Sequence, residues 1–144
     1  MKPGRAEFVS GKRLAVVGVS RTRGFANDIY RHLKESGYTV FPVNDGADEV
    51  GGEKCYRRLD DVPEPVDGVV IVVKPERSEG VVADCARLGI KRVWLQQGAE
   101  SEAALARCQE AGITAVHHAC VLMYANPRGF HKFHRGLVKL FGRL

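Results

Sequence analysis

A short segment near the N-terminus combines residue types that suit phosphate binding. Residues 18–24 read GVSRTRG and follow a β-branched apolar run. Gly18 permits a tight turn and a close approach of the backbone to a ligand, and Ser20 can donate a hydroxyl. A helix that begins directly after this segment adds free N–H groups and the positive end of its dipole. Arg21 and Arg23 supply charge that pairs with a diphosphate, so the segment predicts a phosphate-binding turn.

The segment departs from the G-x-G-x-x-G fingerprint of dinucleotide-binding proteins. Ser20 stands at the second glycine position, and the next glycine is Gly24. Dinucleotide-binding proteins place an acidic residue at the end of the second strand, where it binds the ribose hydroxyls. Here that position is occupied by Asn44, and Asp45 comes one residue later. These departures disfavour ordinary NAD binding, although an NAD(P)-binding redox sensor or enzyme stays an alternative. A nucleotide that carries an additional phosphate suits the two arginines better.

The elements that must position these residues alternate between apolar runs and helical patterns. The runs lack the period-two alternation of half-exposed strands, which indicates a parallel sheet covered on both faces. The pattern predicts an α/β fold: a doubly wound, mostly parallel five-stranded sheet, Rossmann-like, with a C-terminal amphipathic helix. The most hydrophobic run, residues 68–73, should be the central strand. Strands are expected at residues 13–19, 38–43, 68–73, 92–95 and 114–118, helices at 24–36, 78–88, 101–111 and after Pro127, and one helical turn at 57–62.

The loops that follow the expected strands should form one ligand site. The carboxyl ends of parallel strands meet at one edge of the sheet, and ligands of this fold class bind there. The fold therefore brings residues from five loops, distant in the sequence, to the turn at residues 18–24. Beyond that turn, the residues concerned are Asn44, Lys74, Pro75, Gln97, Gly98 and Cys120.

Taken together, these segments resemble the small stand-alone coenzyme A-binding proteins, whose fold is similar to the nucleotide-binding domain of the succinyl-CoA synthetase α-subunit. The resemblance covers residues 10–122. The chain departs from the family pattern where Asp45 replaces a usual Pro, and where Lys74-Pro75 replaces a more common Arg-containing segment. It also reads His118-Ala119-Cys120 where Asp-Arg-Cys is frequent. The matching segments are Val17-Gly18-Val19-Ser20, residues 37–44, Gly52 with Tyr56, Leu59 and Val62-Pro63 before Val66-Asp67, residues 93–98 and 111–113, and Cys120.

The resemblance implies that the chain binds coenzyme A or an acyl-CoA at the carboxyl edge of the sheet. The adenine would lie between Val19 and Pro75, and the pantetheine arm would run toward Cys120. No catalytic triad or carboxylate pair is placed by a motif, which favours binding without catalysis. The chain would then act as a carrier, a sensor or, through Cys120, a thiol-exchange partner. The residues expected to bind the cofactor are Gly18, Val19, Ser20, Arg21, Arg23, Asn44, Lys74, Pro75, Gln97, Gly98 and Cys120.

Length and composition fit one folded domain. The 144 residues are 44% apolar and 27% charged, which excludes wholesale disorder. We expect a single domain over residues 1–144, with its core at 10–122. No apolar run is long enough to span a membrane, and the N-terminus lacks the apolar core of a signal peptide, so a cytoplasmic location is expected. The four cysteines form no C-x-x-C pair, and no cysteine or histidine spacing matches a zinc site.

The positive net charge of +5 is concentrated at the two ends of the chain. Residues 123–144, the expected extension, carry five Lys or Arg and no acidic residue. This basic segment is an alternative basis for function, as a nucleic-acid or partner-binding helix. The Phe and Leu side chains on one face of that helix instead favour docking on the chain's own domain or on a second copy, so nucleic-acid binding is disfavoured and a homo-oligomer is conceivable.

Overall fold

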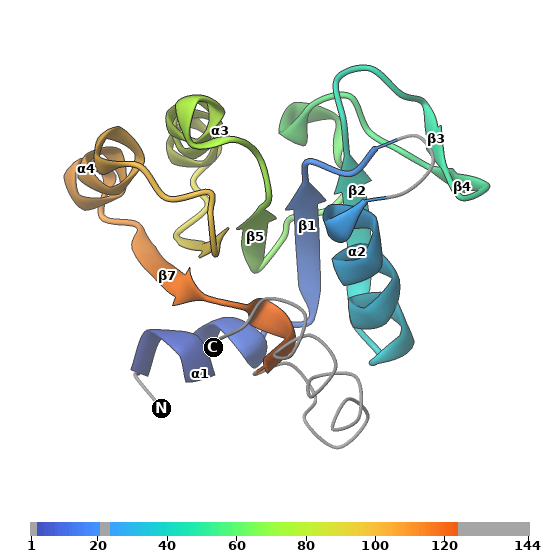
Figure 1. Ribbon diagram of the computed structural model, residues 1–144, viewed down its shortest axis with the longest axis horizontal. Coiled ribbons are helices and arrows are strands. Elements are labelled where there is room, and N and C mark those ends of the chain that lie inside the picture. Colours follow the sequence, from blue (N-terminus) through green and yellow to red (C-terminus); the bar gives the residue numbers. More distant parts are fainter. Residues whose placement is uncertain (1–2, 21–23, 124–144) are drawn as a thin grey trace.

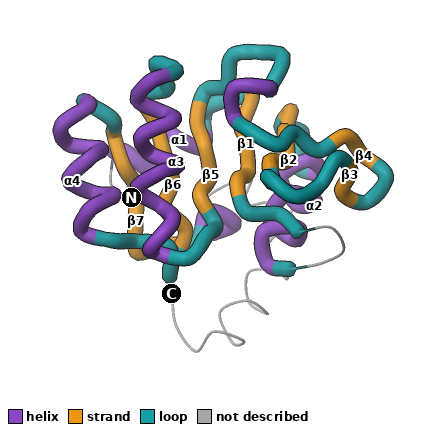
Figure 2. Tube along the Cα trace, turned by 90° about the horizontal axis from the view of Figure 1, so that it is seen from above, coloured by secondary structure: helices purple, strands orange, loops and turns teal. Residues whose placement is uncertain are grey.

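The computed structural model describes residues 3–20 and 24–123, which contain a five-stranded parallel sheet (Figure 1). The strands lie in the order β2-β1-β5-β6-β7, and every neighbouring pair is parallel (Figure 2). The central strand is β5, as its hydrophobicity predicted, and all its residues are buried. The predicted doubly wound α/β fold is therefore confirmed. The strands are β1 (Arg13–Val17), β2 (Thr39–Val43), β5 (Gly68–Ile71), β6 (Arg92–Gln96) and β7 (Thr114–Ala119).

Helices cover both faces of the sheet and create two hydrophobic cores. Figure 1 shows α3 and α4 on one side of the sheet and α1 on the other. Val16 and Val70 pack with α1, α2 and η2, whereas Val69 and Ile71 pack with α3 and α4. Successive residues of a strand therefore pack into the cores on opposite faces of the sheet, which explains why the strands lack an alternation of apolar and polar residues. The helices are α1 (Pro3–Val9), α2 (Phe25–Glu35), α3 (Pro75–Arg87), α4 (Glu102–Ala111) and the 3₁₀ helix η2 (Val121–Met123).

The helix α1 was not expected from the sequence. Phe8 is 2% exposed, and its ring meets that of Trp94 edge-on with centroids 5.4 Å apart. A Cβ atom on Gly68 would lie 2.6 Å from the Phe8 ring, so the absence of a side chain at residue 68 makes room for this contact. The core therefore includes a residue before position 10. Seven residues are too few to form a stable helix alone, which explains why local pattern did not reveal α1.

The connection between β2 and β5 contains a small hairpin that the sequence analysis missed. Its strands are β3 (Glu49–Val50) and β4 (Glu53–Lys54), and they are antiparallel. Gly51 and Gly52 join them with φ angles of +57° and +81°, the left-handed backbone that a tight hairpin turn requires. Two-residue strands show no periodicity, so only the Gly-Gly pair could have signalled them. The helical turn expected at residues 57–62 is confirmed as the 3₁₀ helix η1 (Leu59–Asp61).

The boundaries of the other elements differ from expectation by one to three residues. The largest difference is at α3, which begins at Pro75 and not at Ser78, with proline in a position that its fixed φ favours. The amphipathic helix expected after Pro127 lies outside the described residues. Among the described helices, none has the length and hydropathy that a transmembrane segment requires.

Candidate functional site

A pocket of 740 Å³ opens at the carboxyl edge of the sheet, where β1, β2 and β5 end. The chain first places β2 on one side of β1 and then crosses over to place β5 on the other side. Such a reversal of strand order is where open α/β sheets bind their ligands. One wall of the pocket is apolar and could accept a nucleotide base. It consists of Val17, Val43, Leu59, Val72, Val73 and Val81.

Gly18 allows the chain to turn sharply at the end of β1. Its φ is +118°, which side-chain-bearing residues rarely adopt, and its N–H donates to the carbonyl of Val43 at 3.1 Å. A Cβ atom at this position would lie 2.0 Å from the carbonyl oxygen of Val72, so no larger residue fits. The sequence prediction that Gly18 permits a tight turn is confirmed. The turn directs the following residues along the floor of the pocket.

Two asparagine side chains hold the backbone after this turn. The carboxamide of Asn27, on α2, accepts from the Ser20 N–H at 2.7 Å and donates to the Ser20 carbonyl at 2.8 Å. The carboxamide of Asn44 donates to the Val19 carbonyl and accepts from the Gly46 N–H at 2.6 Å. Asn27 is 5% exposed, so its two bonds form away from competing water. These bonds hold the backbone of Val19 and Ser20 in place.

Among the described residues, four cations line the pocket, and one of these four was predicted from the sequence. Lys74 was expected to bind the cofactor, and it lines the pocket. Within residues 3–20 and 24–123 its side chain forms no ion pair. Arg57 and Arg58 come from the connection after β4, and Arg77 comes from the first turn of α3. A signal for Arg77 was present, because a helix beginning at Pro75 places it one turn after Lys74 at the carboxyl edge. Arg57 and Arg58 reach this edge because Tyr56 pairs with Val43, which no local pattern shows.

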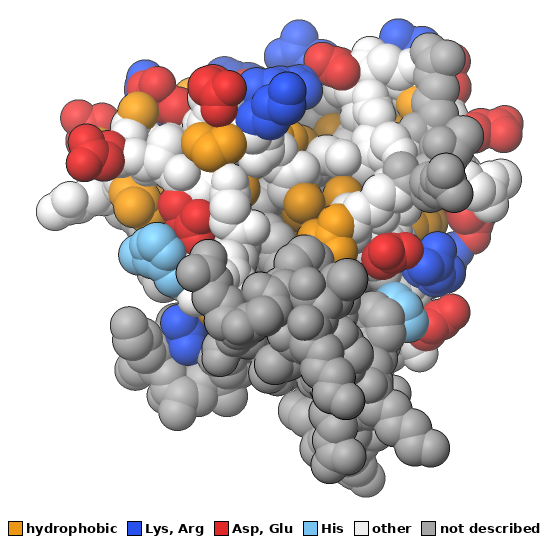
Figure 3. All heavy atoms as spheres, viewed as in Figure 1, with side chains coloured by type: hydrophobic (Ala, Val, Ile, Leu, Met, Phe, Trp, Pro, Cys, Tyr) orange, Lys and Arg blue, Asp and Glu red, His pale blue; other side chains and the backbone are white. Residues whose placement is uncertain are grey.

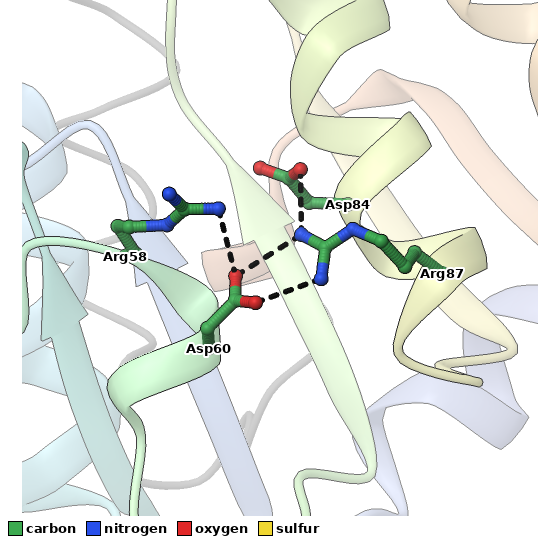
Figure 4. Close-up of polar contacts among 4 residues, drawn as sticks. All are labelled: Arg58, Asp60, Asp84 and Arg87. Atoms are coloured by element: carbon green, nitrogen blue, oxygen red, sulfur yellow. Dashed lines mark hydrogen bonds and ion pairs between the residues drawn. The ribbon is translucent and has the colours of Figure 1, made fainter.

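The basic side chains of the pocket rim are interleaved with acidic ones. Figure 3 shows both kinds side by side along the upper edge of the molecule. Arg87 donates to Asp60 at 2.7 and 3.1 Å and to Asp84 at 3.0 Å, and Arg58 approaches Asp60 at 3.5 Å (Figure 4). The bonds from Arg87 lower the pKa of Asp60 to about 2. This cluster links η1 to α3 beside the pocket.

A second polar cluster lies beyond β6 and β7 at the same edge of the sheet. The Glu100 carboxylate accepts from the Gly98 N–H at 2.9 Å and from the His118 N–H at 2.8 Å. Burial alone would raise the pKa of Glu100, but the backbone N–H groups of Glu100, His118 and Gly98 outweigh it and lower the pKa. Glu100 thereby ties the loops after β6 and β7 together. His118 adopts a φ of +57°, which only glycine tolerates easily.

The expected site residues divide into three groups. The structure brings Gly18, Val19, Ser20, Asn44 and Lys74 together in the pocket. Arg21 and Arg23 lie outside the described residues. Among the described residues, Pro75, Gln97, Gly98 and Cys120 do not line the pocket, although all four follow strands at the same edge.

Two expected contacts are corrected by the burial of the side chains concerned. Val19 is 1% exposed and packs in the core beneath α2, so it cannot flank an adenine. Cys120 is 2% exposed in the same core, so its thiol is not presented to a ligand for exchange. An apolar residue at the end of a strand can be buried in the hydrophobic core or exposed in the ligand site. Only the tertiary packing decides which of the two occurs. Among the described residues, no cluster of His, Cys, Asp or Glu is suited to a metal ion.

A family model described as a CoA binding domain matches residues 12–126 of the chain. An uncharacterised protein of Bacillus subtilis is 30% identical over 124 residues, which cover 83% of this chain and 92% of that protein. A solved structure of a hypothetical protein from Pyrococcus horikoshii has a TM-score of 0.75 at 31% identity, covering 89% of this chain and 88% of the other. Each of these two matches covers most of this chain and most of the matched protein.

The chain is also similar to a small part of a larger enzyme. An ADP-forming acetate–CoA ligase of Archaeoglobus fulgidus is 40% identical over 83 residues. The match covers 56% of this chain but only 12% of the ligase. The likeness is therefore to one segment of the ligase, and most of that enzyme has no counterpart in the aligned region.

Proposed function

The chain belongs to the family of CoA binding domains, and on that premise we propose that it binds coenzyme A, or an acyl-CoA, in the pocket beyond β1, β2 and β5. The observation that carries the proposal is the turn at Gly18, which is held from both sides by Asn27 and Asn44 inside a pocket with a cationic rim. Because the backbone of Val19 and Ser20 is already held in place, these two residues need little further ordering when phosphate binds.

In this proposal the diphosphate of coenzyme A lies against the turn between Gly18 and α2. Ser20 and Lys74 supply donors there, and Arg21 and Arg23 neutralise the charge. The adenine packs on the apolar lining of the pocket, in contact with the partly exposed Val73 and not with Val19. The pantetheine arm leads across the sheet edge toward Gln97 and Gly98.

We further propose that binding occurs without catalysis, so that the protein serves as a carrier or a sensor of coenzyme A. Support comes from the family model that matches residues 12–126, whose description names the binding of CoA. The thiol-exchange role considered for Cys120 is not retained, because that side chain is 2% exposed.

Titration calorimetry with coenzyme A and with NAD on the full chain tests the proposal. We expect coenzyme A to bind more tightly than NAD and to appear in the mass spectrum of the protein purified under native conditions. The double variant Arg21→Ala/Arg23→Ala should weaken binding, whereas Arg31→Ala, on the exposed surface of α2, should not. A larger thermal shift with NAD than with coenzyme A would instead support the NAD(P)-binding alternative.

A separate assay addresses catalysis. The protein is incubated with coenzyme A, ATP and acetate, and thioester and ADP are measured. We expect no turnover above that of a heat-denatured sample. Turnover above that of the heat-denatured sample that also requires coenzyme A would show an enzyme.

A further inference from the structure

Two arginines from different elements approach Asp45 in the pocket, Arg77 at its carboxylate and Arg57 at its backbone carbonyl. Arg77, on α3, places Nη2 3.3 Å from Oδ2 of Asp45. Arg57, in the connection after β4, donates from Nη1 to the backbone carbonyl of the same aspartate at 3.3 Å. Arg57 also donates from Nε to Asp48 Oδ1 at 2.8 Å. Asp45 therefore stands between two guanidinium groups that are 32 and 12 residues away in the sequence.

These contacts are weak enough for a ligand to exchange. The side chains of Asp45 and Arg77 are 74% and 62% exposed, and that of Arg57 is 54% exposed. Ion pairs at such exposure contribute little to stability, because water and salt screen them. A phosphate group offers three oxygens where the carboxylate offers two, and it carries up to twice the negative charge. It would therefore compete well with the Asp45 carboxylate for Arg77 and with the Asp48 carboxylate for Arg57.

We propose that Arg57 and Arg77 bind the monoester phosphate of coenzyme A, and that the carboxylates of Asp48 and Asp45 pair with these two guanidinium groups until this phosphate displaces them. This inference rests on the proposed function, since it assigns a part of the same ligand. The diphosphate is assigned to the turn after β1, which leaves the monoester as the remaining phosphate group. Arg57 and Arg77 line the same pocket from the connection after β4 and from α3.

The inference makes Asp45 a determinant of specificity. In the ligand-free protein the carboxylates of Asp45 and Asp48 balance the two arginines. A ligand without the monoester phosphate gains nothing by displacing Asp45, because it would leave that carboxylate unpaired. A ligand with the phosphate replaces a single charge by a group of higher charge and retains both arginines as partners. Discrimination then depends on one phosphate and not on overall negative charge.

Coenzyme A and dephospho-coenzyme A test this inference because they differ only in that phosphate. Calorimetry on the full chain at low ionic strength should give at least about tenfold tighter binding of coenzyme A. Arg77→Gln should bring the ratio of the two affinities close to one by weakening coenzyme A alone. Asp45→Asn should strengthen coenzyme A by about threefold and leave dephospho-coenzyme A unchanged.

A matched control and a second variant keep the test decisive. Arg31→Gln removes a similarly exposed arginine that is paired with Asp28 on α2, outside this pocket, and should leave the ratio unchanged. Arg57→Gln should reduce the ratio of the two affinities as Arg77→Gln does, and it replaces Arg77→Gln in the test if that variant fails to fold. The inference is overturned if the wild-type protein binds coenzyme A and dephospho-coenzyme A with equal affinity. It is also overturned if both arginine variants keep the wild-type ratio of these affinities. In both cases coenzyme A binding itself stands. If neither coenzyme A nor dephospho-coenzyme A binds, the proposed function itself is refuted.

Discussion

The buried carboxamide of Asn27 hydrogen-bonds both backbone groups of Ser20, accepting from its N–H at 2.7 Å and donating to its carbonyl at 2.8 Å. The two residues lie seven positions apart, on α2 and on the turn that precedes it. An isolated loop would sample many conformations, and ordering it would cost free energy on ligand binding. The Asn27 pair removes that cost by ordering the turn in the ligand-free protein.

Replacing Asn27 by Ala should weaken both stability and ligand binding. Two backbone groups of Ser20 would lose their partner, and we expect the free energy of unfolding to fall by about 2 kcal/mol. Urea denaturation measures this change, and calorimetry with coenzyme A measures the affinity. Gln109→Ala removes an exposed amide from α4 and should change neither quantity. Unaltered stability of the Asn27 variant would show that the turn is held by other contacts.

Gly18→Ala should prevent normal folding of the β1 turn. The new methyl group would lie 2.0 Å from the Val72 carbonyl oxygen, and φ of +118° would be strained as well. We expect a loss of more than about 3 kcal/mol and no measurable affinity for coenzyme A.

Gly51→Ala separates the two causes of this loss. Gly51 has a φ of +57°, but no atom lies within 4 Å of a Cβ atom there. Backbone strain alone should cost about 1 kcal/mol. If thermal denaturation gives equal losses for the two variants, the close contact at Gly18 is not the cause.

Glu100→Gln should loosen the loops after β6 and β7. The carboxylate uses one oxygen for the Gly98 N–H and the other for the His118 N–H, whereas glutamine offers a single acceptor oxygen. One N–H would then face an amide donor, which should cost about 1–2 kcal/mol in chemical denaturation. Glu110→Gln, on the exposed surface of α4, provides the control. A loss of the same size in the control would attribute the effect to charge alone.

Asp67 should make stability depend on pH below about pH 5. The backbone N–H groups of Arg13 and Lys12 donate to its carboxylate at 2.9 and 2.8 Å and lower its pKa from 3.8. Because the pKa is lower in the folded state, the stabilisation is complete above the unfolded pKa and is lost as the pH falls through the folded value. Asp67→Ala should therefore be less stable than wild type at pH 7, by about 1 kcal/mol, with a smaller difference at pH 3.

Urea denaturation at the two pH values measures this difference. Asp61→Ala replaces an exposed carboxylate of η1 and should follow the wild-type pH profile. A difference between wild type and Asp67→Ala that stays constant from pH 7 to pH 3 would contradict the role assigned to the Asp67 carboxylate.

The amino-acid sequence by itself determined the sheet, the central position of β5 and the turn at Gly18. These features depend on local properties: the run of apolar residues in β5, the spacing of helical faces, and a glycine at the end of a strand. Lys74 and Asn44 could be assigned to the pocket for the same reason, since each directly follows or closes a strand. Parallel strands fix where such residues emerge.

The tertiary structure alone decided which side chains face the pocket and which enter the core. Val19 and Cys120 also sit near strand ends, but packing against α2 buries both of them. Arg57 reaches the pocket because Tyr56 pairs with Val43 across a connection that has no periodic pattern. Contacts of this kind arise from the meeting of distant segments, and no residue type or spacing within one segment encodes them.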